Sequence, residues 1–214
     1  MKGVHVPMEL LKSRPNYHHG NLEAALLATA TEMVRQKGAE HLSLRAVSAQ
    51  LGVSPSAAYH YFPDKDALIT GLGYSLLDVL ADMQEIAIMK ISGRGVKAAR
   101  ARFRALGTAY FEWATKEPNL FRLLFSAFCE IDPATRDERR ADNRAWNLLQ
   151  GALDDLLATG AMRPEMRPYG EVLAWSSVHG ASALIVAGHL PAEAFNLLMD
   201  GLERALGIGR KPHE

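Results

Sequence analysis

The chain has 214 residues, of which 48% are hydrophobic, so it can bury a substantial core and is not an intrinsically disordered protein. Its single cysteine, Cys129, excludes an internal disulfide framework and a structural zinc site built from several thiolates of one chain. Basic and acidic residues number 24 each, so the net charge is zero and gives no support to a nucleic-acid partner. No N-terminal signal peptide is evident, and we expect a protein of the reducing cytoplasm.

Apolar residues recur along the chain with the 3.6-residue period of an α-helix, and Gly and Pro separate these runs. The sequence therefore predicts an all-α protein of about nine helices with no sheet. The expected helices span approximately residues 22–37, 44–51, 55–62, 65–90, 96–116, 119–128, 133–159, 170–188 and 192–206. The Ser-Gly-Arg-Gly segment at residues 92–95 is the expected hinge between domains.

The most informative segment is SLRAVSAQLGVSPSAAYHYF, residues 43–62. Ser43 and Ser54 are suited to cap two short helices, Gly52 permits the positive φ of a tight turn, and Pro55 suits the first helical position. Two short helices joined in this way have the geometry of a helix-turn-helix, whose second helix enters the major groove of DNA. On spacing alone, a plain corner between two helices of a bundle is an equally good interpretation.

The outer face of the second of these helices carries side chains that suit DNA. Ser56 and His60 can hydrogen-bond to base edges, and Ala57 can contact a thymine methyl group. Tyr59 can contact phosphates, as can the positively charged Lys65 at the start of the next helix. The full set of predicted DNA-contact residues, which includes an N-terminal arm, is His18, His19, Ser43, Arg45, Ser54, Pro55, Ser56, Ala57, Tyr59, His60, Tyr61 and Lys65.

Residues 17–70 resemble the N-terminal domain of the TetR family of transcriptional regulators. YHHGNLEAALLATATEMVRQKGAEHLSLRAV is similar to the first helix of that family and the start of its second, and GVSPSAAYHYFPDKDAL resembles its signature. The resemblance covers about a quarter of the chain and implies that residues 54–60 form a recognition helix, with Tyr59 and Lys65 at phosphate-contacting positions. Ala58 and Ser48 depart from the family pattern, in which a larger aliphatic residue and Ala are common.

The resemblance implies a transcriptional regulator, usually a repressor, that binds a palindromic operator as a homodimer and is released by a small, largely apolar ligand. We accordingly expect a flexible arm at residues 1–13, a helix-turn-helix domain at 14–66 and a ligand-binding and dimerisation domain at 67–210. The expected partners are double-stranded DNA, a second copy of the chain and an effector of unknown identity. We expect no cofactor and no metal.

Aromatic residues are dense in the second half of the chain. At helical spacing they are most often core, but a regulator must also hold its effector, and pockets form between the helices of bundles. The segments EPNLFRLLF and WSSVHG, which begin at Glu117 and Trp175, resemble a TetR subgroup that carries a Trp-His-Gly motif. The candidate ligand contacts are Phe103, Tyr110, Trp113, Phe125, Phe128, Trp146, Trp175 and His179.

The last two expected helices are predicted to form the dimer interface, each packing against its twin in a four-helix arrangement. Small residues at 180, 181 and 183 would permit a close approach. The candidate interface residues are Val178, Ala181, Leu184, Ile185, Phe195, Leu198, Met199 and Leu202.

Residues 172–192 contain no Asp, Glu, Lys or Arg, and this run of 21 residues is long enough to span a bilayer. The run also contains three serines, two histidines and a proline, which make it too polar for membrane insertion. We interpret it as a central or interface helix and expect no membrane partner.

An all-α enzyme is a rival interpretation of the sequence. No Glu has a His three residues on, and neither His-Glu-x-x-His, Gly-x-Ser-x-Gly nor a phosphate-binding Gly-rich loop occurs in the sequence. We predict that the protein is not an enzyme. A helical protein-interaction module that does not bind DNA is the remaining alternative, and it predicts no sequence-selective binding of duplex DNA.

Overall fold

The computed structural model describes residues 22–126 and 143–209, and every regular element in this part of the chain is a helix. This result confirms the expected all-α fold of about nine helices. The elements are α1 (Leu22–Lys37), η2 (Ala39–His41), α2 (Leu44–Leu51), α3 (Pro55–Tyr61), α4 (Lys65–Met89), α5 (Val96–Lys116), α6 (Pro118–Ser126), α8 (Arg144–Ala158), η3 (Pro164–Tyr169), α9 (Gly170–Val186) and α10 (Ala194–Ala205). The first part of the helix expected at 133–159 lies outside the described residues.

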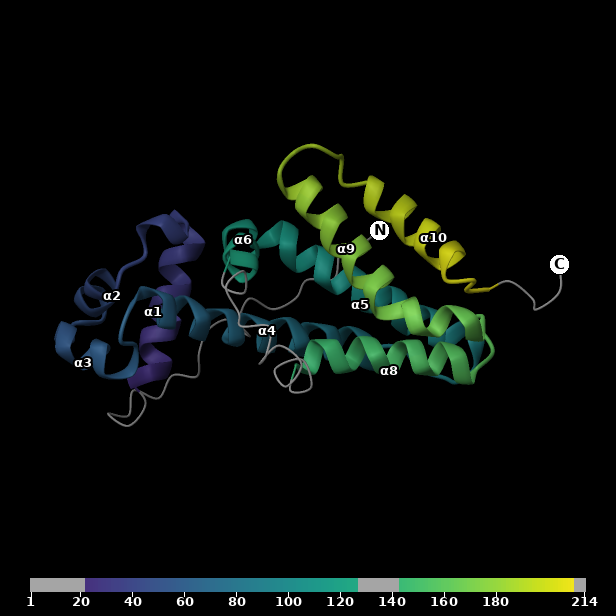
Figure 1. Ribbon diagram of the computed structural model, residues 1–214, viewed down its shortest axis with the longest axis horizontal. Helices are drawn as coiled ribbons and strands as arrows, with labels where there is room; N and C mark the ends of the chain where they lie inside the picture. Colours follow the sequence, from purple (N-terminus) through teal and green to yellow (C-terminus); the bar gives the residue numbers. More distant parts are fainter. Residues whose placement is uncertain (1–21, 127–142, 210–214) are drawn as a thin grey trace.

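Helices α1, α2 and α3 form a small unit at one end of the molecule (Figure 1). Leu26, Ala30 and Val34 are buried along one face of α1, and Val47 of α2 is buried with them. Ala58 of α3 is also fully buried, so its small side chain lies where α3 packs onto the other two helices. The departure from the family pattern at this position is therefore a change in the core and not in the exposed face.

The long helix α4 joins this unit to the rest of the molecule (Figure 1). Asp64 caps its first turn, because Asp64 Oδ1 accepts a hydrogen bond from the backbone N–H of Ala67 at 2.7 Å. Leu68, Leu72 and Leu76, spaced one turn apart, are at most 2% exposed. Because these residues belong to one continuous apolar cluster, the core runs from the first three helices into the C-terminal bundle without a break.

The C-terminal bundle is built around α5, which packs against α4, α6, α8 and α9. Since α4 and α5 lie side by side, residues 92–95 form the connection of a helical hairpin, and their prediction as a hinge between domains is wrong. A Gly-rich composition at this point reflects a tight turn. Helix α10 packs onto α9 on the far side of α5 from α4 (Figure 1). None of the described helices is long and apolar enough to cross a membrane.

The turn between α2 and α3 generates a prediction about stability. Gly52 has φ 75° and ψ 26°, and a Cβ added to it would meet no atom within 4 Å. Gly52→Ala should therefore lower the free energy of unfolding by about 1 kcal/mol through backbone strain alone. Gly151, inside α8, is equally open, so the control Gly151→Ala should raise that free energy by up to about 1 kcal/mol. Urea denaturation measures both, and equal effects of the two substitutions would contradict the prediction.

Candidate functional site

The helix-turn-helix expected from the sequence is present in α2 and α3. Ser43 Oγ accepts a hydrogen bond from the backbone N–H of Ala46 at 3.2 Å, and Ser54 Oγ accepts one from Ala57 at 3.3 Å. Gly52 ends α2 in the left-handed conformation. Both caps and the turn are therefore formed as predicted, and they fix the direction in which α3 leaves the turn.

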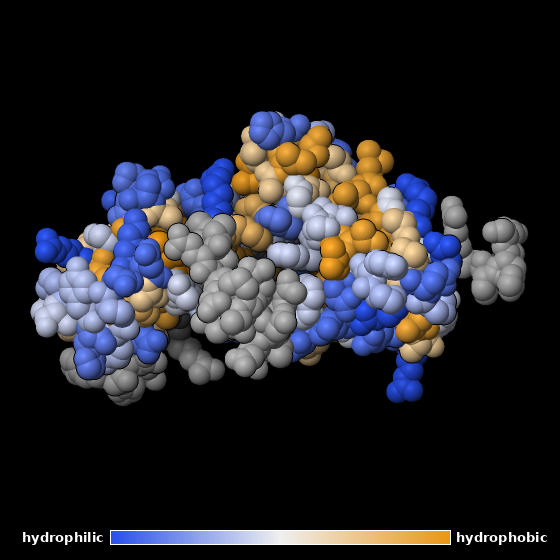
Figure 2. Space-filling view, in the orientation of Figure 1, coloured by the Kyte–Doolittle hydropathy of each residue, from blue (hydrophilic) through white to orange (hydrophobic). Residues whose placement is uncertain are grey.

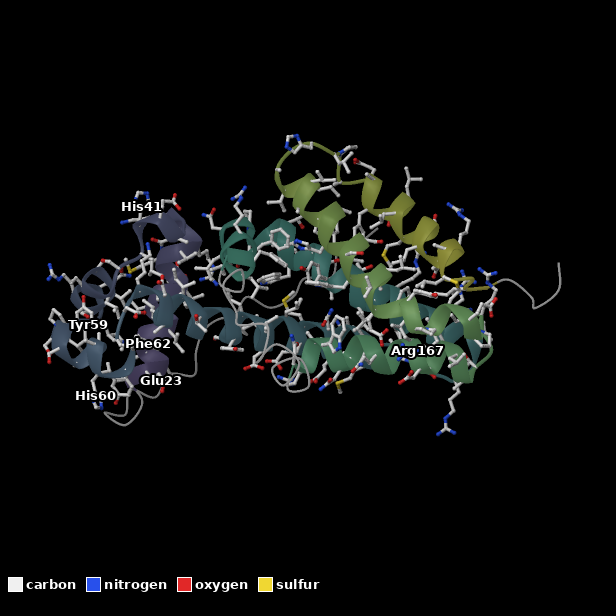
Figure 3. The ribbon with its side chains drawn as sticks, viewed as in Figure 1. Glu23, His41, Tyr59, His60, Phe62 and Arg167 are labelled. Atoms are coloured by element: carbon white, nitrogen blue, oxygen red, sulfur yellow. The ribbon has the colours of Figure 1, made fainter. Side chains whose placement is uncertain are left out.

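Side chains of α3 project from the end of the molecule opposite α10, where Figure 3 labels Tyr59 and His60. Tyr59 and Tyr61 are 44% and 42% exposed, whereas the neighbouring Phe62 is buried in the core. An apolar core therefore does not account for the two tyrosines. Of the other predicted DNA-contact residues, Ala57 and Lys65 are half-buried, and Ser43, Arg45, Ser54, Pro55, Ser56 and His60 are exposed. His18 and His19 lie outside the described residues.

A polar contact joins α1 of this three-helix unit to the C-terminal bundle. Arg35, in the last turn of α1, donates through Nε to both carboxylate oxygens of Glu117, at 3.0 and 3.2 Å. Asn119, in the first turn of α6, donates through Nδ2 to the backbone carbonyl of Arg35 at 3.1 Å. We refer to these three residues as the α1–α6 bridge. No sequence pattern predicts this bridge, because Arg35 and Glu117 are 82 residues apart.

Helices α5, α6, α8 and α9 bring five aromatic side chains together with His179. The imidazole lies 3.6 Å from the ring centroid of Phe125, and the rings of Phe121 and Trp175 are 5.5 and 6.1 Å away. The Tyr110 hydroxyl lies 3.2 Å from Nδ1 of His179. We call this group the aromatic cluster, and it consists of Tyr110, Phe121, Phe125, Trp146, Trp175 and His179.

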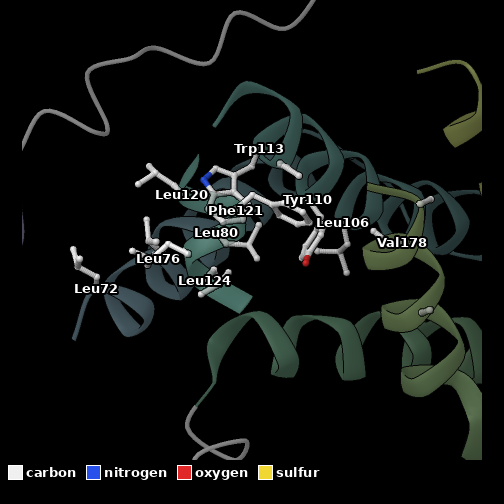
Figure 4. Packing of buried hydrophobic residues seen from close by; sticks show 14 of the residues in the cluster. Leu72, Leu76, Leu80, Leu106, Tyr110, Trp113, Leu120, Phe121, Leu124 and Val178 are labelled. Atoms are coloured by element: carbon white, nitrogen blue, oxygen red, sulfur yellow. The ribbon is translucent and has the colours of Figure 1, made fainter. Parts of the chain in front are cut away.

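Five of the eight predicted ligand residues belong to the aromatic cluster, and Phe121 is an addition to them. Phe121 lies one helical turn before Phe125, a spacing that signals a shared face. Two of the remaining three lie in the core beside the cluster, and the Trp113 ring meets the rings of Tyr110 and Phe121 edge to face, with centroids 6.4 and 6.1 Å apart. Phe103 and Trp113 are 3% and 1% exposed, and Figure 4 places the Trp113 indole beside Leu120, away from the Tyr110 hydroxyl, so both are core residues. Phe128 lies outside the described residues.

The polar groups at the centre of the cluster are uncharged at neutral pH. Burial raises the pKa of the Tyr110 hydroxyl beyond its ordinary range, and a hydrogen bond with the Trp175 side chain lowers it by a smaller amount. Burial lowers the pKa of His179, because the charged imidazolium loses hydration. The centre of the cluster therefore offers hydrogen bonds without a formal charge.

The residues predicted to form a dimer interface are mostly internal. Phe195 stacks on Phe111 of its own chain with ring centroids 4.1 Å apart. Five of the eight predictions are therefore wrong, because Val178, Ala181, Phe195, Met199 and Leu202 are all less than 9% exposed within the protomer. Ile185 and Leu198 are half-buried, and Leu184 is 45% exposed. The open apolar surface of α9 and α10 (Figure 2) instead includes Val172, Leu184 and Leu197.

This architecture, a helix-turn-helix unit fused to a helical bundle, is that of a bacterial transcriptional regulator. Residues 26–72 match the family model for bacterial regulatory proteins of the tetR family, and residues 103–204 match the model for the tetracyclin repressor-like C-terminal domain. Together the two matches span most of the chain, and the protein belongs to the TetR family of helix-turn-helix regulators.

Individual relatives agree with this assignment. An uncharacterized HTH-type transcriptional regulator of Haemophilus influenzae is 28% identical over 97 residues, which are 45% of this chain and 45% of that protein. The present chain thus matches less than half the length of that relative. A Rhodococcus sp. RHA1 protein of unknown function is 28% identical, with a TM-score of 0.74 over 91% of this chain and 100% of that one.

Two further solved structures share the fold. A TetR-family transcriptional regulator of Pectobacterium atrosepticum has a TM-score of 0.69 at 22% identity and covers 94% of this chain and 100% of its own. The transcriptional regulator FadR of Bacillus subtilis, solved in complex with stearoyl-CoA, has a TM-score of 0.66 at 16% identity over 87% of this chain and 99% of its own.

The depressed pKa of His179 predicts a pH dependence of stability. The unfolded chain takes up a proton near the ordinary pKa of 6.5, before the folded chain does. The unfolded state therefore binds more protons just below that pH, and the free energy of unfolding falls as the pH drops below about 6.5. His179→Gln removes this contribution, so between pH 7.5 and 5.5 the variant should lose less stability than the wild type in urea titrations. An unchanged pH dependence would contradict the burial of a neutral imidazole.

Proposed function

We propose that the protein is a cytoplasmic transcriptional repressor of the Trp-His-Gly subgroup, which binds a palindromic operator as a homodimer and leaves it when a small, largely apolar ligand occupies the aromatic cluster. The observation that carries this proposal is the exposed face of α3, joined by one continuous core to a cluster of rings with uncharged polar groups at its centre. The first part supports DNA recognition and the second supports effector binding.

Recognition of DNA would rest on the polar side chains of α3 more than on charge. Ser56 and His60 can reach base edges, and Tyr59 can donate its hydroxyl hydrogen to a phosphate. Ser54 accepts the N–H of Ala57 but keeps its own O–H free to donate, so a capping serine can also contact a phosphate. Arg45 is exposed and Lys65 half-buried, and both would attract the DNA backbone.

Release by ligand would pass through α6. The end of this helix carries Phe125 against His179, and its start belongs to the α1–α6 bridge. A ligand that inserts beside Phe125 displaces α6, and the bridge then changes the position of α1 and with it that of α3. Such a ligand binds best to the displaced conformation and lowers the population that fits the operator.

Selection from random duplex DNA tests the DNA-binding half of the proposal. The wild-type protein should enrich a palindrome, and the Tyr59→Ala, Lys65→Ala double variant should bind it at least about tenfold more weakly because it loses two phosphate contacts per protomer. The matched control Tyr169→Ala, Lys97→Ala removes an exposed tyrosine and lysine far from α3 and should bind normally. If no sequence is enriched even at low salt, the helical-interaction module becomes the better assignment.

The dimer is proposed to form through the outer faces of α9 and α10. Gly180 of α9 and Gly201 of α10 lie inside helices, where glycine is unfavourable, yet a Cβ added to either would meet no atom within 4 Å. Packing within the protomer therefore does not require these glycines. The exposed Val172, Leu184 and Leu197 belong to the same two helices, and small residues beside apolar ones suit close packing against a second copy.

Gly180→Leu tests this interface. The added side chain should leave the protomer folded but raise the dissociation constant of the dimer at least about tenfold, because it blocks the close approach of the two copies. The control Gly151→Leu places the same side chain in an equally open position on α8 and should leave the dimer intact. Sedimentation equilibrium measures both, with circular dichroism as the check on folding. Dimers of equal strength in both variants would exclude this face of α9.

A further inference from the structure

The hydrogen bonds of the aromatic cluster determine which nitrogen of His179 carries the proton. When a phenol meets a neutral imidazole, the phenol O–H is the stronger donor and the unprotonated ring nitrogen is the stronger acceptor. The hydroxyl hydrogen of Tyr110 is then available for Nδ1 of His179, at 3.2 Å. A neutral imidazole that accepts at Nδ1 carries its hydrogen on Nε2. The cluster therefore presents the Nε2–H group of His179 as a donor.

This donor is not used within the described part of the chain. His179 is half-buried, and the Tyr110 hydroxyl is its one hydrogen-bond partner among residues 22–126 and 143–209. Its other close neighbours there are the rings of Phe121, Phe125 and Trp175, none of which offers a strong acceptor. A half-buried donor among rings is satisfied best by an acceptor that arrives with a ligand.

Charge on the surrounding helices restricts the kind of acceptor. The arginines of α5, α8 and η3 are already paired with carboxylates of the protein. Arg100 and Arg104 pair with Glu203, Arg102 with Asp155, Arg144 with Asp82 and Glu85, and Arg167 with Asp154 and Glu171. The remaining arginine of these helices, Arg122 of α6, is exposed and bonded to Asn119. Among the described residues, a carboxylate ligand in the cluster would therefore lose its hydration without gaining a buried cation, which is unfavourable. An ammonium group would face the N–H of His179 and have no acceptor there.

We propose that the effector is an uncharged aromatic compound whose carbonyl or ether oxygen accepts a hydrogen bond from Nε2 of His179. Its ring packs against Trp146 and Trp175, whose indoles already meet edge to face with centroids 6.3 Å apart. The inference rests on the proposed function, since it takes the aromatic cluster to be the effector site. Neutral aromatic ketones, esters and ethers belong to this class, and carboxylic acids and amines do not.

Three single-ring probes of similar size test the proposal by isothermal titration of the full-length protein. Acetophenone carries an uncharged acceptor, benzoate carries a charged one, and ethylbenzene carries none. Acetophenone should bind roughly tenfold more tightly than either of the others, which is the effect of one well-made hydrogen bond. Nitrogen-15 spectra of the imidazole should show the Nε2–H tautomer and a shift of Nε2 when acetophenone is added.

Two variants assign the preference to His179. His179→Gln keeps an N–H donor and should keep a preference for acetophenone over ethylbenzene, whereas His179→Leu should abolish it. The preference in the wild type together with its loss in His179→Leu supports the proposal. Benzoate binding as tightly as acetophenone, no binding of any probe, or a preference that survives in His179→Leu would overturn it.

This experiment contains no DNA, so its failure is distinct from failure of the proposed function. If acetophenone binds as expected but the protein enriches no operator, the ligand class stands and the regulator assignment falls. If an operator is enriched but benzoate binds best, the regulator assignment stands and the ligand class is overturned.

Discussion

A largely buried ion pair, Arg35–Glu117 of the α1–α6 bridge, is the polar connection between the two halves of the molecule on which the proposed mechanism depends. The side chains of Arg35 and Glu117 are only 26% and 14% exposed. Removing one partner of a largely buried ion pair leaves an uncompensated charge, which is strongly unfavourable. Helices α1 and α6 therefore keep their relative position, and any ligand that moves α6 acts on α1 as well.

Close packing along α4 supplies the second connection. A Cβ at Gly71 would lie 3.0 Å from the Phe62 ring, so the α4 backbone packs closely against the side chain that follows α3. Well-packed interiors transmit displacement because they contain little free volume. With α6 held to α1 and α4 held to Phe62, the first three helices follow the C-terminal bundle as one body.

Local features of the fold were predictable from the sequence, and long-range contacts were not. Ser43, Gly52 and Ser54 act on groups within a few residues of themselves, so their spacing alone predicted the helix-turn-helix. Arg35 and Glu117 are 82 residues apart, and no periodicity links them. The interface prediction failed for a related reason. A 3.6-residue apolar stripe identifies the face of α10 that is buried but not what covers it, and Phe195 and Met199 are covered by the protomer itself. Small, open positions such as Gly180 are the better signal, but they require the structure.

The even charge balance of the chain makes the proposed dimer important for DNA binding. A single α3 face has few cations near it, chiefly Arg45 and Lys65, so one protomer would bind DNA weakly. Two protomers held at a fixed spacing convert the second contact into an intramolecular one and raise the overall affinity without any new contact. The same argument explains how the affinity for DNA can be lost. In the proposed mechanism, a ligand that alters the separation of the two α3 helices removes the cooperative gain while leaving each half-site contact intact, so a modest movement of α6 would be sufficient for release.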